Sequence, residues 1–132
     1  MATAAELLSK IDLFADLDRG ELRDVAGGTK EYSFAAGREI VSEGQSGVGF
    51  FVISSGTASV SVGGATVRTL GPGDYFGEVA LIAEAPRTAS VTAESDVTAY
   101  GISSWAFRPI VENNGKLAWK LLQVLAKHLS SR

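Results

Sequence analysis

The sequence predicts one mainly β domain with helices at both ends. Between residues 29 and 102, short runs of β-favouring residues alternate with glycine-containing turns. The flanking segments, residues 1–28 and 103–132, have the spacing of amphipathic helices. The chain has 15 glycines in 132 residues, and most of them fall between the short runs, as many tight turns require. Many short strands at regular spacing indicate a sandwich or a closed barrel.

Composition restricts the classes of function. The 45% hydrophobic and 20% charged fractions are those of an ordinary globular protein, and the length supports one core. No apolar run approaches the roughly 18–20 residues of a membrane span, and the first residues do not form a signal peptide. The absence of cysteine excludes disulfides and thiol catalysis. We therefore expect a cytoplasmic protein without membrane contact, and the net charge of −3 gives no reason to expect nucleic acid.

The N-terminal segment is predicted to form two short helices that cover the core. Residues 4–11 place their apolar side chains on one helical face, with Thr3 as a possible cap. Asp18 can cap a second helix over residues 19–26, which the following glycines stop. Neither helix carries residues that suggest chemistry.

Seven candidate strands occupy the middle of the chain. In one of them, valines alternate with serines, which predicts one buried and one solvated face. Gly63 and Gly64 predict a tight hairpin directly after that strand. The candidates are residues 29–34, 39–42, 49–54, 58–62, 66–70, 89–93 and 97–102.

Two helices are predicted at the C-terminal end. Ser103 or Ser104 caps the first, and residues 113–115 (Asn-Asn-Gly) break it. Pro109 lies well inside this helix and suggests a kink or an early end, because proline cannot donate the helical hydrogen bond.

The last helix, over residues 116–130, is amphipathic. One apolar row consists of Leu117, Leu121, Leu125 and His128, and a second row beside it consists of Ala118, Leu122, Leu125 and Leu129. We expect the lysines of this helix on its solvated face, namely Lys116, Lys120 and Lys127.

Residues 76–91, FGEVALIAEAPRTASV, contain what a buried phosphate ester needs. Gly77 opens a short apolar helix, whose free N–H groups and positive dipole end point to one place, and Pro86 ends that helix. Arg87 then offers a guanidinium that can hold two phosphate oxygens. Glu78 would be repelled by an anion, so its expected partner is a neutral donor such as a sugar hydroxyl.

This segment resembles the phosphate-binding cassette of cyclic nucleotide-binding domains. That family includes the catabolite activator protein, the regulatory subunits of protein kinase A and cyclic-nucleotide-gated channels. The residues that carry the resemblance are Phe76-Gly77-Glu78, Ala80-Leu81 and Pro86-Arg87-Thr88-Ala89-Ser90. The resemblance extends over the whole chain, residues 1–132, as a single domain. It implies an eight-stranded jelly-roll β-barrel over residues 29–102, with helices on either side.

The resemblance also implies a role for each residue of the site. Arg87 would hold the cyclic phosphate and Glu78 the ribose 2′-hydroxyl. Backbone N–H groups around Gly77, Ala80 and Ala89 would hold the phosphate oxygens. The expected ligand-binding residues are Phe76, Gly77, Glu78, Val79, Ala80, Arg87, Thr88 and Ala89.

The base of the nucleotide is less well specified. Trp119 and Leu122 are possible lids over it, although core packing of Trp119 is an equal alternative and Leu121 and Leu125 are rivals. Thr88 does not decide between cyclic AMP and cyclic GMP. We favour cyclic AMP, because no second guanine-reading group is evident. No metal or other cofactor is expected.

The resulting prediction is a non-catalytic sensor of a cyclic nucleotide, acting on an unknown effector protein or domain through movement of the last helix. The alternative is a degenerate domain of the same fold that acts only through protein contacts with an empty pocket, although intact Glu78 and Arg87 argue against it. Considered singly, Arg87 could instead pair structurally with an acidic residue, and Glu78 could complement the helix dipole. A cupin-type metal enzyme would need two or three histidines, and the chain has only His128. A transcription factor would need a DNA-reading domain, which we do not expect after the last helix. The oligomeric state and the extent of the whole protein stay open.

Overall fold

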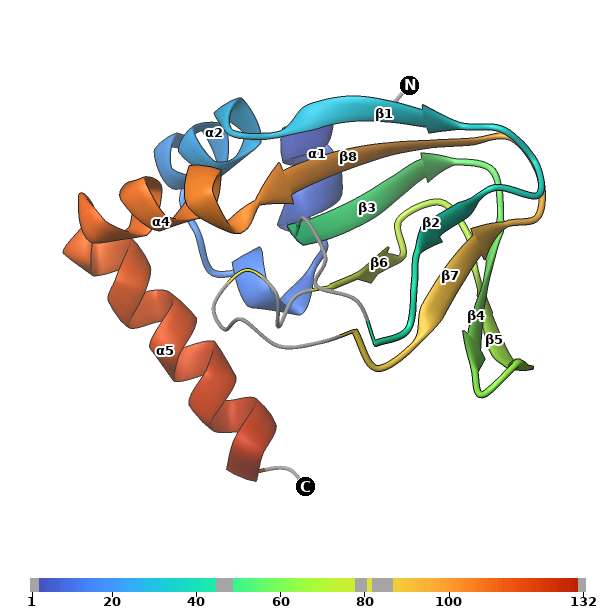
Figure 1. Ribbon diagram of the computed structural model, residues 1–132. Coiled ribbons are helices and arrows are strands. Elements are labelled where there is room, and N and C mark those ends of the chain that lie inside the picture. Colours follow the sequence, from blue (N-terminus) through green and yellow to red (C-terminus); the bar gives the residue numbers. More distant parts are fainter. Residues whose placement is uncertain (1–2, 45–48, 78–80, 82–86, 131–132) are drawn as a thin grey trace.

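The computed structural model describes residues 3–44, 49–77, 81 and 87–130, and the statements below concern those residues. Eight strands and five helical segments follow one another along the chain (Figure 1). The strands are β1 (Lys30–Phe34), β2 (Glu39–Val41), β3 (Gly49–Ser55), β4 (Ala58–Val62), β5 (Ala65–Leu70), β6 (Tyr75–Phe76), β7 (Ser90–Ala93) and β8 (Val97–Ser103). The helical segments are α1 (Ala4–Ser9), the 3₁₀ helix η1 (Asp12–Phe14), α2 (Arg19–Gly27), α4 (Ser104–Glu112) and α5 (Gly115–Ser130).

The strands form two antiparallel sheets of four, in the orders β1-β8-β3-β6 and β2-β7-β4-β5. Only β4 and β5 are consecutive neighbours in one sheet, and the chain otherwise crosses between the sheets, as in a double-sheet jelly roll. The mainly β fold with eight strands is confirmed. Among the described residues no pairing joins one sheet to the other, so the eight strands form a sandwich, which the strand spacing predicted as an alternative to a closed barrel.

The seven strands predicted from the pattern are all found, within one or two residues of their expected ends. The eighth strand, β6, was not among them. It has only two residues, which pair with Phe51 and Val52 of β3, and two residues are too few to show a periodicity. Its existence depends on tertiary pairing.

Both N-terminal helices begin with the predicted caps. The Thr3 side chain accepts a hydrogen bond from the N–H of Glu6 at 3.2 Å, and Asp18 accepts one from Glu21 at 2.8 Å. Each glutamate returns a bond to the backbone of its cap, so both ends are complete capping boxes. The sequence signal was sufficient here because the capping interaction is local.

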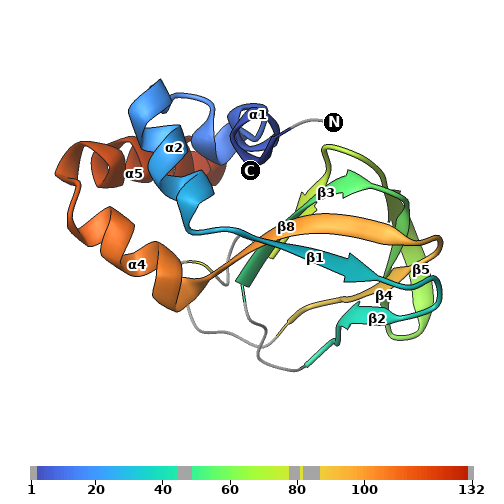
Figure 2. The ribbon, with the colours of Figure 1, turned by 90° about the horizontal axis from the view of Figure 1, so that it is seen from above.

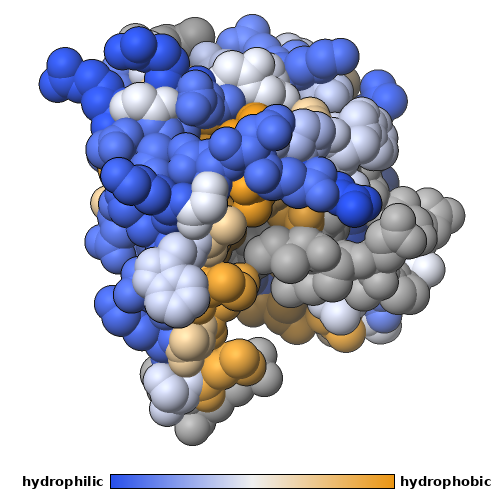
Figure 3. All heavy atoms as spheres, turned by 90° about the vertical axis from the view of Figure 1, so that its left-hand side faces the viewer, coloured by the Kyte–Doolittle hydropathy of each residue, from blue (hydrophilic) through white to orange (hydrophobic). Residues whose placement is uncertain are grey.

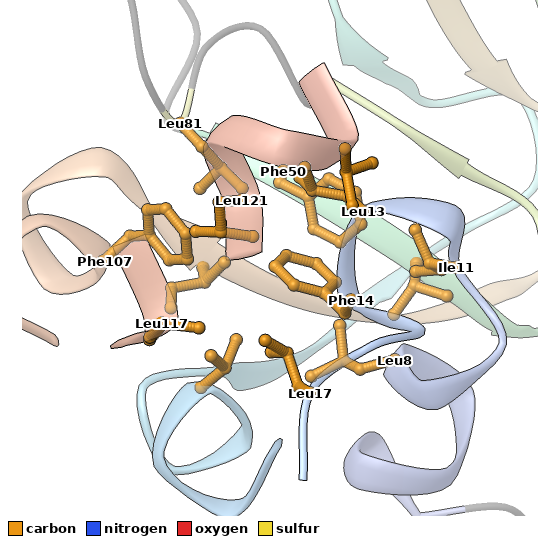
Figure 4. Packing of buried hydrophobic residues seen from close by; sticks show 14 of the residues in the cluster. Leu8, Ile11, Leu13, Phe14, Leu17, Phe50, Leu81, Phe107, Leu117 and Leu121 are labelled. Carbon is orange, nitrogen blue, oxygen red and sulfur yellow. The ribbon is translucent and has the colours of Figure 1, made fainter. Parts of the chain in front are cut away.

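The helices α2, α4 and α5 gather at one end of the sheets (Figures 1 and 2). Between them lies a hydrophobic cluster with Phe14 near its centre (Figure 4). The Phe14 ring meets Phe50 of β3 and Phe107 of α4 edge-on, with centroid distances of 5.8 and 6.2 Å. Phe14 therefore joins the N-terminal segment to a central strand and to a C-terminal helix. No helix among the described residues is long and apolar enough to cross a membrane.

Two expectations for the C-terminal helices need correction. The helix α4 begins at the predicted cap, Ser103, but continues three residues past Pro109. In α5, the first predicted apolar row is partly right, since Leu117 and Leu121 are buried. The second row reaches the core only through Leu125, which packs against it, whereas Leu122 and Leu129 are exposed and the third buried position is Val124. The width of an apolar stripe does not reveal which of its edges packs against the rest of the protein.

Lys120 is half-buried and binds another residue, which corrects the expectation that it lies freely on the solvated face. Its ammonium lies 2.6 Å from a carboxylate oxygen of Glu21, whose side chain is only 7% exposed. That oxygen also accepts the N–H of Asp18, so one buried carboxylate caps α2 and binds α5. The hydrogen bond to Glu21 raises the pKa of Lys120, whereas partial burial acts in the opposite direction. The pair fastens the last helix to the first part of the chain.

This pair should give a pH-dependent contribution to stability. The folded-state pKa of Lys120 is raised, so the contribution is complete below the lysine pKa of the unfolded chain and is lost as pH rises through the folded value. Lys120→Met should lower the free energy of unfolding at pH 7, and the difference from the parent should shrink above about pH 10.4. Urea unfolding between pH 7 and 11.5 measures it.

Lys127→Met is the matched control, because Lys127 is an exposed lysine of the same helix. The pKa of Tyr100 is also raised, by burial and by Glu31, but Tyr100 titrates in every variant and cancels in the difference. A Lys120→Met difference that stays constant to pH 11.5 would show that the pair does not stabilise the fold.

Candidate functional site

Arg87 is the centre of the candidate site. It immediately precedes the turn into β7, and the residue is only 9% exposed. Its Nη2 donates a hydrogen bond of 2.6 Å to the carbonyl oxygen of Gly49, the first residue of β3. Burial lowers the pKa of the Arg87 guanidinium, yet an arginine remains charged in proteins. A buried positive charge is therefore a fixed property of this site.

The described residues do not satisfy every donor of the guanidinium. Its Nε is buried and finds no hydrogen-bond partner among the residues that the structure describes. A carbonyl is also a neutral acceptor, and no carboxylate within the described ranges forms an ion pair with Arg87. Because a buried charge is costly unless it is paired, the arrangement fits an anion that accepts from the remaining donors.

Two glycines allow close backbone approaches around the site, one to the guanidinium and one to β8. Gly77 has φ +86°, and a Cβ there would overlap both Arg87 Nη1 and the Gly49 carbonyl oxygen. Gly49 has φ +150°, and a Cβ there would overlap the carbonyl oxygen of Ile102 in the neighbouring strand β8. Gly77 thus approaches the guanidinium, and Gly49 approaches β8, at distances that only glycine permits.

The structure brings some of the predicted residues to this place. Gly77 and Arg87 are in direct proximity, as expected. Thr88 is exposed, and Ala89 is half-buried against the core between the sheets. Phe76 is buried in that core, where its ring stacks on Phe51 with a centroid distance of 5.4 Å. The Phe76 side chain therefore packs the sandwich, and only its backbone adjoins the site.

Other predicted residues lie outside the described part of the chain. Glu78, Val79 and Ala80 belong to this group, and so does Pro86. Their roles stay predictions. Leu81 is described, and it is buried in the helical cluster with Phe107 and Leu121 (Figure 4).

The two proposed lids, Trp119 and Leu122, lie on α5 and are 63% and 57% exposed. Hydrophobic side chains are visible on the face of the molecule that carries this helix (Figure 3). The alternative that Trp119 packs in the core is therefore wrong. Leu121, a rival lid, is a core residue instead.

The main chain of the site was missed by sequence reasoning. The Gly49 carbonyl binds the guanidinium, and the Gly44 N–H donates to the Arg87 carbonyl at 2.7 Å. The sequence signal was a glycine at each end of the loop between β2 and β3, namely Gly44 and Gly49. A glycine in the sequence does not reveal in which direction its N–H or carbonyl points. Among the described residues, no group of three His, Cys, Asp or Glu side chains could hold a metal ion.

The chain is similar in sequence and in structure to several known proteins. A family model described as cyclic nucleotide-binding domain matches residues 31–114, more than half of the chain. The N-terminal domain of a transcriptional regulator from Streptomyces coelicolor A3(2) is 25% identical, with a TM-score of 0.89, and the match covers 95% of this chain and 93% of that one. A cyclic nucleotide-binding-like protein from Brucella abortus bv. 1 str. 9-941 is 33% identical, with a TM-score of 0.76 and coverage of 84% and 99%. The cAMP-bound PfPKA-R (141–441) is 29% identical, with a TM-score of 0.71, and this chain covers 45% of it.

The close approach at Gly77 can be tested against a matched glycine. Gly73 has φ +90°, but a Cβ there would meet nothing within 4 Å. Gly73→Ala and Gly77→Ala should both lose about 1–2 kcal/mol of stability from the left-handed backbone. Only Gly77→Ala should lose more and move the NMR signal of the Arg87 Nε–H, because its methyl group displaces the guanidinium. Equal losses and an unmoved Arg87 signal would contradict the packing described here.

Proposed function

The chain belongs to the family of cyclic nucleotide-binding domains, and from that premise we propose that it binds a 3′,5′-cyclic nucleotide through Arg87 and catalyses no reaction. The observation that carries the proposal is the buried guanidinium of Arg87, which has a neutral carbonyl for one donor and no described acceptor for Nε. A cyclic phosphate carries a single negative charge and two free oxygens, which a guanidinium can hold side by side.

Residues around Arg87 complete the proposed contacts. The close approach at Gly77 places backbone beside the guanidinium, so that main-chain N–H groups can reach the same phosphate. Glu78 would accept a hydrogen bond from the ribose 2′-hydroxyl, while Ala80 and Ala89 would contribute N–H groups. These assignments rest on the match of the sequence to the family's cassette.

We propose cyclic AMP as the preferred ligand and Trp119 or Leu122 as its cover. Both side chains are exposed on α5, so large apolar surface is available to stack on a purine. One similar structure, PfPKA-R, is described as cAMP-bound, which favours the same base here.

Movement of α5 is the proposed output. Leu81 lies within the segment between Gly77 and Arg87, and it is buried in the cluster that also contains Phe107 of α4 and Leu121 of α5 (Figure 4). A shift of that segment on phosphate binding would have to repack Leu81 against these helices, because cores do not deform continuously. The α5 amide signals should then change with ligand.

The deciding experiment is a titration of the chain with 3′,5′-cyclic AMP, 3′,5′-cyclic GMP and linear 5′-AMP, followed by calorimetry and NMR. The cyclic nucleotides should bind far more tightly, because the linear phosphate differs in charge and shape and cannot engage Arg87 and the backbone together. Arg87→Ala should weaken cyclic nucleotide binding by about 2–4 kcal/mol, roughly thirty- to thousandfold. Arg87→Lys should recover only part, since it offers a point charge.

The ligand-free melting temperature of each variant is the control for folding. Equal affinity for cyclic and linear nucleotides would refute the proposed ligand class. If no nucleotide binds, the alternative of a degenerate domain that acts through protein contacts would be favoured. Binding that leaves the α5 signals unchanged would contradict only the proposed output.

The Glu78 contact can be tested with two proteins and two ligands. If Glu78 accepts from the ribose, a 2′-deoxy cyclic nucleotide should bind the parent more weakly by about 1–3 kcal/mol, because the carboxylate loses its donor. The penalty should shrink in Glu78→Gln, where a neutral amide is less costly to leave unpaired. The coupling in this cycle measures the contact. An identical penalty in both proteins would mean that Glu78 does not touch the sugar.

A further inference from the structure

The loop that connects β2 and β3 is bonded to Arg87 at both of its described ends. At the start, the Gly44 N–H donates to the Arg87 carbonyl at 2.7 Å. At the other end, the Gly49 carbonyl accepts from the Arg87 guanidinium at 2.6 Å. The main chain and the side chain of the arginine are thus fixed separately, and the main-chain bond depends on the turn at residues 43–44.

That turn is itself held from two sides. The Glu43 N–H donates to the hydroxyl of Ser90, the first residue of β7, at 2.8 Å. The Glu43 carboxylate accepts the N–H of Gly63 at 3.0 Å, and Gly63 lies in the hairpin between β4 and β5. One carboxylate therefore ties the hairpin to the turn that holds Arg87.

We propose that Glu43 is a positioning residue for Arg87. Its carboxylate fixes the turn at residues 43–44 against the hairpin, and the turn fixes the main chain from which the guanidinium extends. The inference rests on the proposed function, because it concerns how tightly Arg87 holds a phosphate. It adds a residue that would not touch the ligand.

Electrostatics alone predicts the opposite change in ligand affinity when Glu43 is replaced. An exposed carboxylate in this region repels an anionic ligand, so its removal would leave affinity unchanged or slightly improved after screening by salt. Positioning predicts a loss, because Arg87 would sample more orientations in the ligand-free state and more freedom would be lost on binding. The direction of the change in affinity therefore distinguishes the positioning role from simple electrostatic repulsion.

The test compares Glu43→Ala, Glu43→Gln and Glu39→Ala in the full chain, with cyclic AMP as the probe. Glu39 is the matched control: it is an exposed glutamate in β2, just before the loop, and among the described residues its carboxylate accepts only a local bond from the Ser42 hydroxyl. Glu43→Ala should weaken binding about three- to tenfold and speed hydrogen exchange of the Gly44 N–H by a similar factor. Glu43→Gln keeps an acceptor oxygen and should stay within about twofold of the parent, as should Glu39→Ala.

Each outcome decides the proposal. Weaker binding with faster Gly44 exchange in Glu43→Ala alone supports it. Unchanged or tighter binding, or weaker binding with unchanged Gly44 exchange, overturns it, and so does a Glu43→Gln variant that is as weak as Glu43→Ala. If the parent binds no cyclic nucleotide, the proposed function fails, while Gly44 exchange still shows whether Glu43 fixes the turn.

Discussion

The burial of the Arg87 guanidinium imposes the conditions that the surrounding chain must meet. A charge removed from water needs acceptors, and the described residues supply a single carbonyl, that of Gly49. That carbonyl is available because Gly49 adopts φ +150° and lies against β8 without a side chain. The approach of Gly77 requires a glycine for the same reason. The strand order matters here too, since β8 lies directly beside β3.

Local signals in the sequence predicted the elements well. The caps at Thr3 and Asp18, the short strands and the hairpin at Gly63 depend on neighbours within a few residues, and these were found. What failed depended on contacts distant in sequence. Strand β6 exists through pairing with β3, and Lys120 finds its partner 99 positions away. The division of the strands into two open sheets likewise depends on pairings that no single strand's pattern specifies.

The site shows the same division between what is local and what is not. Arg87 and Gly77 were identified because their residue types and spacing have a chemical meaning on their own. The Gly49 carbonyl and the Gly44 N–H were not, because every residue has these groups and only the fold gives them a direction. The ring of Phe76 packs in the core, a contact with Phe51 that depends on the fold, and its contact with the ligand stays a prediction.

Strand β3 explains how one arginine can influence both halves of the molecule. Its side chains alternate between two cores: Phe50 and Val52 belong to the helical cluster, while Phe51 and Ile53 belong to the core between the sheets. The first residue of this strand binds Arg87. A displacement of the guanidinium therefore acts on the strand that separates the two cores, and β3 reaches the helices through Phe50 and Phe14. The proposed signal from a bound phosphate to α5 would therefore start at the end of β3, where Arg87 binds the Gly49 carbonyl.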